Sequence, residues 1–255
     1  MKKITALVIA GIAFSAHVAA SAADAPAPIG TRNIVIVPGA FVDGSGWRVV
    51  HDILIHKGYH VSIVGQPNTT LDENVAATRS IINAQDGAVV LVGHSSGGSV
   101  ITIAGNRAKV TALVYVAALQ PDIGESIDQL TASMPAPGND IHSTRDGHLY
   151  FEQNKFGADF AGDLSSNRTD FMAVSQQFVS QEIFAAPVWE SAWRSKPSYA
   201  IVAADDRVLN PDLQRRMYQR AGSIVTEIKG SHAVYISQPE AVASVIEAAA
   251  MSAQQ

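Results

Sequence analysis

The sequence contains no cysteine among its 255 residues. This absence excludes disulfide bonds, cysteine nucleophiles and thiolate metal sites, so the hydrophobic core alone has to stabilise the fold. Basic residues are also few: 18 lysines and arginines are outnumbered by 23 aspartates and glutamates, and no basic run occurs. Because nucleic-acid binding depends on clustered basic side chains, we exclude that class of partner. The eight histidines show no HExxH or similar spacing, so we predict neither a metal nor a cofactor.

Long hydrophobic runs are missing except near the N-terminus, where Lys2 and Lys3 precede an apolar stretch at 4–14. Small residues follow and end at Ala20-Ser21-Ala22, which completes the three-part pattern of a secretory signal peptide. A membrane anchor is the alternative, but a spanning helix needs ~20 apolar residues. We therefore predict that residues 1–22 are a signal peptide. We expect the mature chain, 23–255, to have no membrane span and to be exported to the periplasm or the extracellular space.

Hydrophobic residues make up 47% of the chain, which is ample for a core. Short apolar runs lie at 34–37, 61–64, 88–92, 112–116, 199–203 and 224–228. Helical spacing separates them, with start signals at Thr70 and Glu73 and at Asn210 and Pro211. Strands that are apolar throughout are typical of a sheet covered on both faces. The alternation predicts an α/β fold with a mainly parallel, doubly wound sheet.

The strand pattern lapses between 121 and 197, where Pro, Gly, Asn, Asp and scattered aromatic residues prevail. A structureless loop of that length is uncommon in a compact domain, so we predict a helical cap inserted over one edge of the sheet. A separate small domain without a role at the site is the alternative. Trp189 and Trp193 in this segment, with Phe41 after the first strand, are candidate substrate-binding residues. Cap aromatics also serve to hold helices together.

The sharpest motif is Gly93-His94-Ser95-Ser96-Gly97, which follows the run at 88–92 and precedes a helical stretch. A strand that turns abruptly into a helix needs small residues around the turn and projects its central side chain from the carboxyl edge of the sheet. We therefore predict Ser95 as a nucleophile, with Ser96 as the rival. An ordinary glycine-rich turn is the alternative, since the chain has 19 glycines.

A serine nucleophile needs a base and an acid that orients this base. His232 follows the run at 224–228 and is the best candidate for the base. Asp206 follows the run at 199–203 and is our choice for the acid, with Asp205 as the alternative. Each role falls at the carboxyl end of a different strand, in the order Ser, Asp, His.

Acyl transfer also needs hydrogen-bond donors for its oxyanion. The turn Pro38-Gly39-Ala40 follows the first predicted strand, and its glycine permits close approach of the backbone to a substrate. We predict the backbone N–H groups of Ala40 and Ser96 as the oxyanion hole. A plain connection between strand and helix is the alternative.

These motifs resemble the α/β-hydrolase superfamily, in particular its branch of small lidded esterases and hydroxynitrile lyases, which includes plant methyl-salicylate esterases. The resemblance extends over residues 34–248, and its further carriers are Trp47, Ala117-Ala118, Pro121-Asp122, Arg207 with Pro211, Gly230 and Pro239. It implies the same roles for Ser95, Asp206 and His232, and the same amide donors.

Two departures from the family pattern bear on function. Pro38 stands where the family usually has histidine, which affects the hydrogen bonds of the oxyanion loop but not its amides. Ala233 and Gly39 stand where hydroxynitrile lyases of this branch have lysine and threonine. Without the lysine no cation stabilises a departing cyanide, so the resemblance disfavours lyase activity.

We expect a secreted serine hydrolase that cleaves a small carboxylic ester through an acyl-enzyme. The same triad could act on a lactone or in perhydrolysis. From another class, the alternative is a non-catalytic binding protein with an α/β-hydrolase fold. The expected partner is the small-molecule ester.

Overall fold

The computed structural model describes residues 28–138 and 140–252. The predicted signal peptide, residues 1–22, lies outside the described residues. Within the two described ranges, no helix combines the length and the apolar character that a membrane span requires.

A parallel sheet forms the centre of the molecule, with the strand order β2-β1-β3-β4-β8-β9. Its strands are β1 (Asn33–Val37), β2 (His60–Ile63), β3 (Val89–His94), β4 (Val110–Val116), β8 (Ser198–Ala203) and β9 (Ile224–Ile228). Each of the apolar runs predicted from the sequence forms one of these strands.

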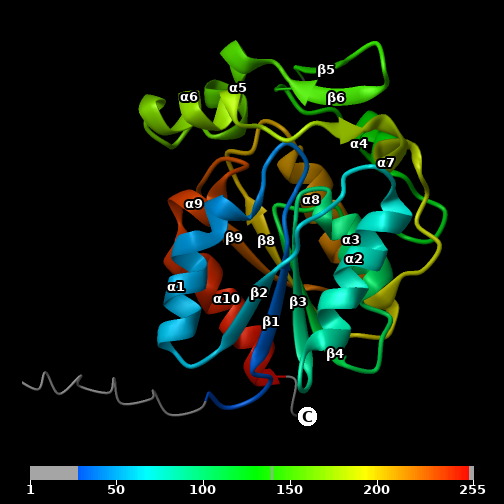
Figure 1. Ribbon diagram of the computed structural model, residues 1–255, viewed down its shortest axis with the longest axis vertical. Coiled ribbons are helices and arrows are strands. Elements are labelled where there is room, and N and C mark those ends of the chain that lie inside the picture. The colour runs from blue at the N-terminus through cyan, green and yellow to red at the C-terminus, as the bar shows by residue number, and fades with distance from the viewer. Residues whose placement is uncertain (1–27, 139, 253–255) are drawn as a thin grey trace, which may run out of the picture.

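Helices cover both faces of this sheet (Figure 1). They are α1 (Arg48–His56) and α10 (Pro239–Ser252) on one face, and α2 (Leu71–Ala84), α3 (Gly97–Ala104) and α8 (Pro211–Ala221) on the other. Tyr115 of β4 marks the second face, because its hydroxyl is hydrogen-bonded to Thr102 of α3 and its ring contacts Tyr218 of α8. The predicted doubly wound α/β fold is confirmed.

Local signals determine where several helices begin and end. The Thr70 side chain accepts a hydrogen bond from the backbone N–H of Glu73 (3.1 Å), which satisfies a donor at the start of α2. Asn210 caps α8 in the same way, and Pro211 takes its first position. The helix ends at Gly222, whose φ of 65° lies in the left-handed region that glycine adopts without strain.

The core lies between the sheet and its two helical layers. β1, β3 and β8 are buried along their whole length, and so is α3. The edge strand β9 differs, since Ile224 is 58% exposed and Val225 is 45% exposed. An apolar run alone does not distinguish an edge strand from a central one.

The predicted cap insertion lies over the carboxyl ends of the strands (Figure 1). It contains α4 (Ile127–Ser133), β5 (Ile141–Ser143), β6 (His148–Phe151), α5 (Gln153–Phe160), α6 (Ser166–Val174), β7 (Val179–Ser180) and α7 (Gln181–Ala185). The small antiparallel sheet β5-β6-β7 is an addition to the helices expected there. Its strands are two to four residues long, which is too short for a periodic pattern to reveal them.

The strand order creates a crevice at the carboxyl edge of the sheet. The chain passes from β1 to β2 on one side and then returns to β3 on the other side of β1. The loops after β1 and β3 therefore diverge, and ligands of such sheets usually bind at this point. Ala40 follows β1 and Ser95 follows β3, so both lie at this crevice.

Candidate active site

Ser95 occupies a sharp turn between β3 and α3. Its φ of 52° lies in the left-handed region, which costs a non-glycine residue roughly 1–3 kcal/mol. Gly97 is needed beside it, because a Cβ there would lie 2.6 Å from the carbonyl oxygen of Val37. The turn thus has the strained geometry between strand and helix that the motif predicts.

His232 lies between Ser95 and Asp206 and is hydrogen-bonded to both. Its Nε2 is 2.8 Å from Ser95 Oγ, and its Nδ1 is 2.7 Å from Asp206 Oδ2. His232 is 0% exposed and Asp206 is 3% exposed. The three side chains follow β3, β8 and β9, so the parallel sheet brings together residues that are far apart in the chain.

The Asp206 carboxylate is surrounded by donors. Its Oδ1 accepts from the backbone N–H groups of Val208 (2.8 Å) and Leu209 (2.9 Å), and its Oδ2 accepts from Gln214 Nε2 (2.8 Å) as well as from His232. With Nδ1–H of His232 donated to this carboxylate, Nε2 is left to accept the Ser95 proton. The neighbouring Asp205 is exposed, and its side chain makes no hydrogen bond within the described part of the chain. The geometry therefore pairs His232 with Asp206.

His94 lies directly behind His232. Its Nε2 is 2.9 Å from the carbonyl oxygen of His232, and the two ring centroids are 4.7 Å apart. Burial, and secondly the neighbouring His232, lower the pKa of His94 well below its ordinary value. The ring is therefore neutral, and it donates its Nε2–H because a carbonyl only accepts. This contact holds the backbone at His232, a role that no sequence motif indicated.

The predicted oxyanion donors lie in the same cavity as Ser95. The backbone N–H of Ala40 donates to Ser96 Oγ at a distance of 2.8 Å. A rotation of the Ser96 side chain therefore has to release the Ala40 N–H before this group can bind a substrate oxygen. Since Ser96 pairs with Ala40 and Ser95 pairs with His232, the geometry favours Ser95 over its rival as the nucleophile.

The loop that carries Ala40 is anchored by Gln66. The Nε2 of Gln66 donates to the carbonyl oxygen of Pro38 at 2.7 Å. Gly39 lies tightly against the elbow, where a Cβ would be 2.7 Å from Ser95 Cβ. The loop is thus held in place with proline at the position where the family usually has histidine.

A cavity of about 440 Å³ opens over Ser95 and His232. Phe41, one of the candidate substrate-binding residues, lines it. The cap and the neighbouring loops supply further apolar walls, which include Leu119, Ile127, Ala132, Ile141, Leu149, Phe160, Phe184, Val208 and Leu209. The arrangement suits an uncharged group held against Ser95.

Charge is scarce around this cavity. Asp128 of α4 is the one acidic or basic residue, apart from His232, among the described residues that line it, and burial raises the pKa of its carboxyl. Within residues 28–138 and 140–252, no three His, Asp or Glu side chains cluster in a way that could hold a metal ion.

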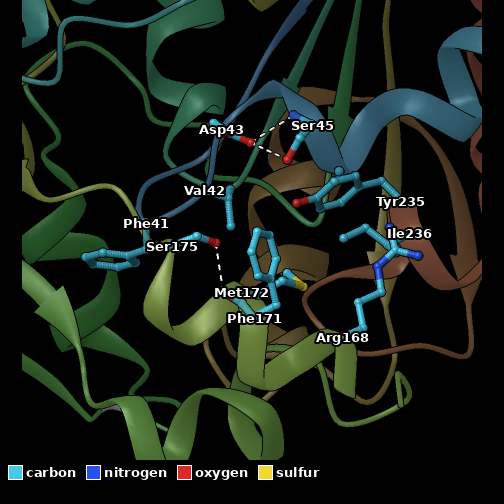
Figure 2. A pocket seen from close by; sticks show the side chains of 11 residues that line it. Phe41, Val42, Asp43, Ser45, Arg168, Phe171, Met172, Ser175, Tyr235 and Ile236 are labelled. Atoms are coloured by element: carbon cyan, nitrogen blue, oxygen red, sulfur yellow. Dashed lines mark hydrogen bonds between the residues drawn. The ribbon is translucent and has the colours of Figure 1, made fainter. Parts of the chain in front are cut away.

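A smaller cavity of about 150 Å³ shares Phe41 with the first (Figure 2). Phe171 and Met172 of α6 face Val42 there. Its floor includes Tyr235, whose ring centroid is 4.6 Å from that of His94. This second cavity contains none of the three hydrogen-bonded residues, so it lies beside the chemistry and not at it.

Trp189 and Trp193 are not among the described residues that line the larger cavity, which corrects the prediction made for them. Trp193 Nε1 donates to the carbonyl oxygen of Pro121 at 2.8 Å, and the guanidinium groups of Arg194 and Arg220 lie against its ring. Trp193 therefore joins the two ends of the cap. Trp189 is 43% exposed.

The α/β-hydrolase fold is defined by a doubly wound parallel sheet with a strained serine turn between a strand and a helix. An acid and a histidine follow later strands of the sheet, as they do here. The chain belongs to the Alpha/beta hydrolase family, which matches residues 34–245. This finding confirms the resemblance inferred from the motifs.

A carbendazim-hydrolysing esterase from Nocardioides sp. (strain SG-4G) is 35% identical over 109 residues, which are 37% of this chain and 45% of that protein. The chain thus spans about half the length of this relative.

Similar solved structures cover most of the chain. A pyrethroid hydrolase from Sphingobium faniae JZ-2 has a TM-score of 0.71 and 23% identity, over 85% of this chain and 96% of that one. Polyneuridine aldehyde esterase has a TM-score of 0.73 and 18% identity, over 85% and 98%. Tomato methylketone synthase I has a TM-score of 0.74 and 17% identity, over 88% and 99%. At these identities the likeness shows the fold alone.

Proposed function

We propose that the protein is a serine hydrolase that cleaves small carboxylic esters. The observation that carries this proposal is the continuous hydrogen-bonded chain from Ser95 through His232 to Asp206, with distances of 2.8 and 2.7 Å, at the floor of an apolar cavity. The relationship to an esterase supports the same class of reaction.

In the first half of the reaction, Ser95 Oγ attacks the ester carbonyl carbon while its proton passes to Nε2 of His232. The Asp206 carboxylate stabilises the imidazolium through its bond to Nδ1. The N–H groups of Ala40 and Ser96 bind the negative oxygen of the tetrahedral intermediate once the Ser96 side chain has turned away. The ester C–O bond then breaks, and His232 returns the proton to the leaving alcohol.

In the second half, water enters and His232 takes one of its protons while the oxygen attacks the acyl carbon of the acyl-enzyme. The bond to Ser95 Oγ breaks, His232 gives the proton back to Ser95, and the carboxylic acid leaves. The histidine therefore acts as base and acid in turn.

The size and the lining of the cavity favour a small, uncharged substrate. Its volume of about 440 Å³ lies within the range of ~300–1,000 Å³ that is usual for small-molecule sites. The apolar walls favour an alkyl or aryl group on the acyl or alcohol side, because its burial releases water from apolar surface.

The test is Ser95→Ala, assayed on p-nitrophenyl esters of increasing acyl length and on lactones. We expect kcat to fall by about 10³-fold or more, since the nucleophile is lost while binding is kept. Ser80→Ala, an exposed helix serine, serves as the matched control and should equal the wild type. Activity of Ser95→Ala close to that of the control would refute the proposal.

The same assay separates the alternatives that share the triad. Turnover of lactones but not of esters would indicate a lactonase. Turnover that requires added peroxide would indicate a perhydrolase. A complete lack of turnover together with no reaction towards fluorophosphonates would indicate a binding protein with this fold.

We also propose export of the mature chain, on the basis of the pattern at residues 1–22. N-terminal sequencing of the protein from an expressing Gram-negative host should begin at Ala23. A protein that keeps Met1 would contradict this.

A further inference from the structure

One short segment of the cap, residues 159–163, contacts both loops that carry the acid and the base. It starts at the end of α5, and three of its residues make polar contacts with the loop at 230–233 or the loop at 205–209. Two of these contacts use the carboxylates of Asp159 and Asp163, which the proposed chemistry does not need, and the third uses the backbone carbonyl of Phe160. The segment therefore links the cap to the active site by more than apolar packing.

The loop of the base is held at Ser231, the residue before His232. The Asp163 carboxylate accepts from the backbone N–H of Ser231 (2.9 Å) through Oδ2 and from its hydroxyl (2.5 Å) through Oδ1. Partial burial raises the pKa of Asp163, but the hydrogen bonds that its carboxylate accepts, those from Ser231 foremost, together outweigh this effect, and the net shift is downward. The carboxyl is therefore ionised at neutral pH, and its hydrogen bonds are charge-assisted.

The same loop is held from the other side at Ala233. The Phe160 carbonyl oxygen accepts from the Ala233 N–H at 3.1 Å. The Phe160 ring also meets the His232 imidazole edge-on, with centroids 4.8 Å apart and planes at 86°. Cap atoms thus contact the histidine and both of its neighbours in the chain.

The loop of the acid is held by a third contact. Asp159, which is 5% exposed, accepts from Arg207 Nε at 2.8 Å, and Arg207 follows Asp206 directly. The carbonyl oxygen of Arg207 in turn accepts from the cap residue Gly138 (2.7 Å). Both loops are therefore hydrogen-bonded to the same short segment of the cap, residues 159–163.

We propose that Asp163 is a positioning residue for the base: through Ser231 it holds His232 at hydrogen-bonding distance from Ser95. This inference rests on the proposed function. A misplacement of about 1 Å in a reacting group can lower the rate by about 100-fold. Since Asp163 itself is exposed, its replacement leaves the core intact.

The test compares Asp163→Ala and Asp163→Asn with Asp170→Ala. Asp170 is an exposed cap carboxylate of α6 whose side chain makes no hydrogen bond or ion pair within the described residues, so it is the matched control. We expect Asp163→Ala to lower kcat by about 10- to 100-fold with KM within about twofold. Asp163→Asn keeps one acceptor oxygen and should recover part of this loss. Active-site titration corrects for unfolded protein.

A double-mutant comparison with Ser231→Ala sharpens the result. Because Asp163 and Ser231 act through one contact, the double variant should lose little more than Asp163→Ala alone. A kcat of Asp163→Ala equal to that of Asp170→Ala, a loss confined to KM, or additive losses in the double variant would each overturn the proposal. Activity in Ser95→Ala would instead overturn the proposed function, so the two failures are distinguishable.

Discussion

Replacing Asp206 by asparagine changes one atom in the hydrogen-bonded series Ser95, His232 and Asp206. We expect this change to abolish most of the activity of the enzyme. Asparagine has a single acceptor oxygen and an NH₂ group that only donates. Its oxygen is best placed towards the backbone N–H groups of Val208 and Leu209, which occupy Oδ1 in the native protein. The NH₂ group then faces His232 Nδ1. The ring has to keep its proton on Nε2, where it can no longer accept the proton of Ser95.

The magnitude follows from these contacts. Loss of the productive tautomer should lower kcat by about 10³- to 10⁴-fold, as in other triads. The new NH₂ group also faces the Nε2 donor of Gln214, whose Oε1 is already used by the Ala203 N–H (3.1 Å). A buried donor without an acceptor lowers the free energy of unfolding by about 1–3 kcal/mol. Most of the protein therefore remains folded while activity is lost.

Asp205→Asn is the matched control, because it makes the same change of charge one residue earlier at an exposed position. Initial rates on a p-nitrophenyl ester give kcat and KM, and urea unfolding gives the stability. We expect Asp205→Asn to stay within about twofold of the wild type, since exposed charges contribute little. Asp206 is not the acid that orients His232 if Asp206→Asn keeps more than a tenth of the wild-type activity, or if the activity of Asp205→Asn falls as far.

Two further predictions concern His94 and Ser96, which are the sequence neighbours of Ser95. Burial lowers the pKa of His94 in the folded protein, whereas histidine in the unfolded chain has a pKa of ~6.5. Below pH ~6.5 the unfolded state therefore binds one proton more than the folded state. As the pH falls through this range, the free energy of unfolding decreases by up to about 1.4 kcal/mol per pH unit. Urea unfolding at two pH values should show that the free energy of unfolding of His94→Gln depends less on pH than that of the wild type. An equal pH dependence would show that His94 does not cause it. Ser96→Ala removes the resting partner of the Ala40 N–H, so kcat should stay equal or rise by up to about tenfold; a tenfold fall would show that the hydroxyl itself contacts the oxyanion.

The central sheet and the elbow could be predicted because each has a strong local signal. The apolar runs of β1, β3 and β8 are buried on both faces, and continuous hydrophobicity is what such strands require. The elbow depends on Gly97, whose hydrogen approaches the backbone too closely for any side chain. Each signal is a short run of consecutive residues, although the contact that requires glycine at position 97 is made with the distant Val37.

The cap contacts could not be predicted, because they depend on pairs that are distant in the chain and have no motif. Asp163 and Ser231 are 68 positions apart, and neither residue type is unusual at a surface. Trp193 was a candidate substrate-binding residue because it lies in the aromatic-rich cap segment, but its indole N–H donates to the carbonyl oxygen of Pro121. Composition predicts that a cap is present, whereas tertiary packing decides whether each aromatic ring points into the cavity or away from it.

The role of Ser95 as the activated nucleophile is tested by the reaction of the protein with a fluorophosphonate, followed by mass spectrometry of its peptides. We expect one adduct per chain, on Ser95, which forms rapidly in the wild type and much more slowly in His232→Ala, because the imidazole has to accept the Ser95 proton. An adduct on another residue would rule out Ser95 as the nucleophile, and equal labelling of Ser95 in His232→Ala would rule out His232 as its base.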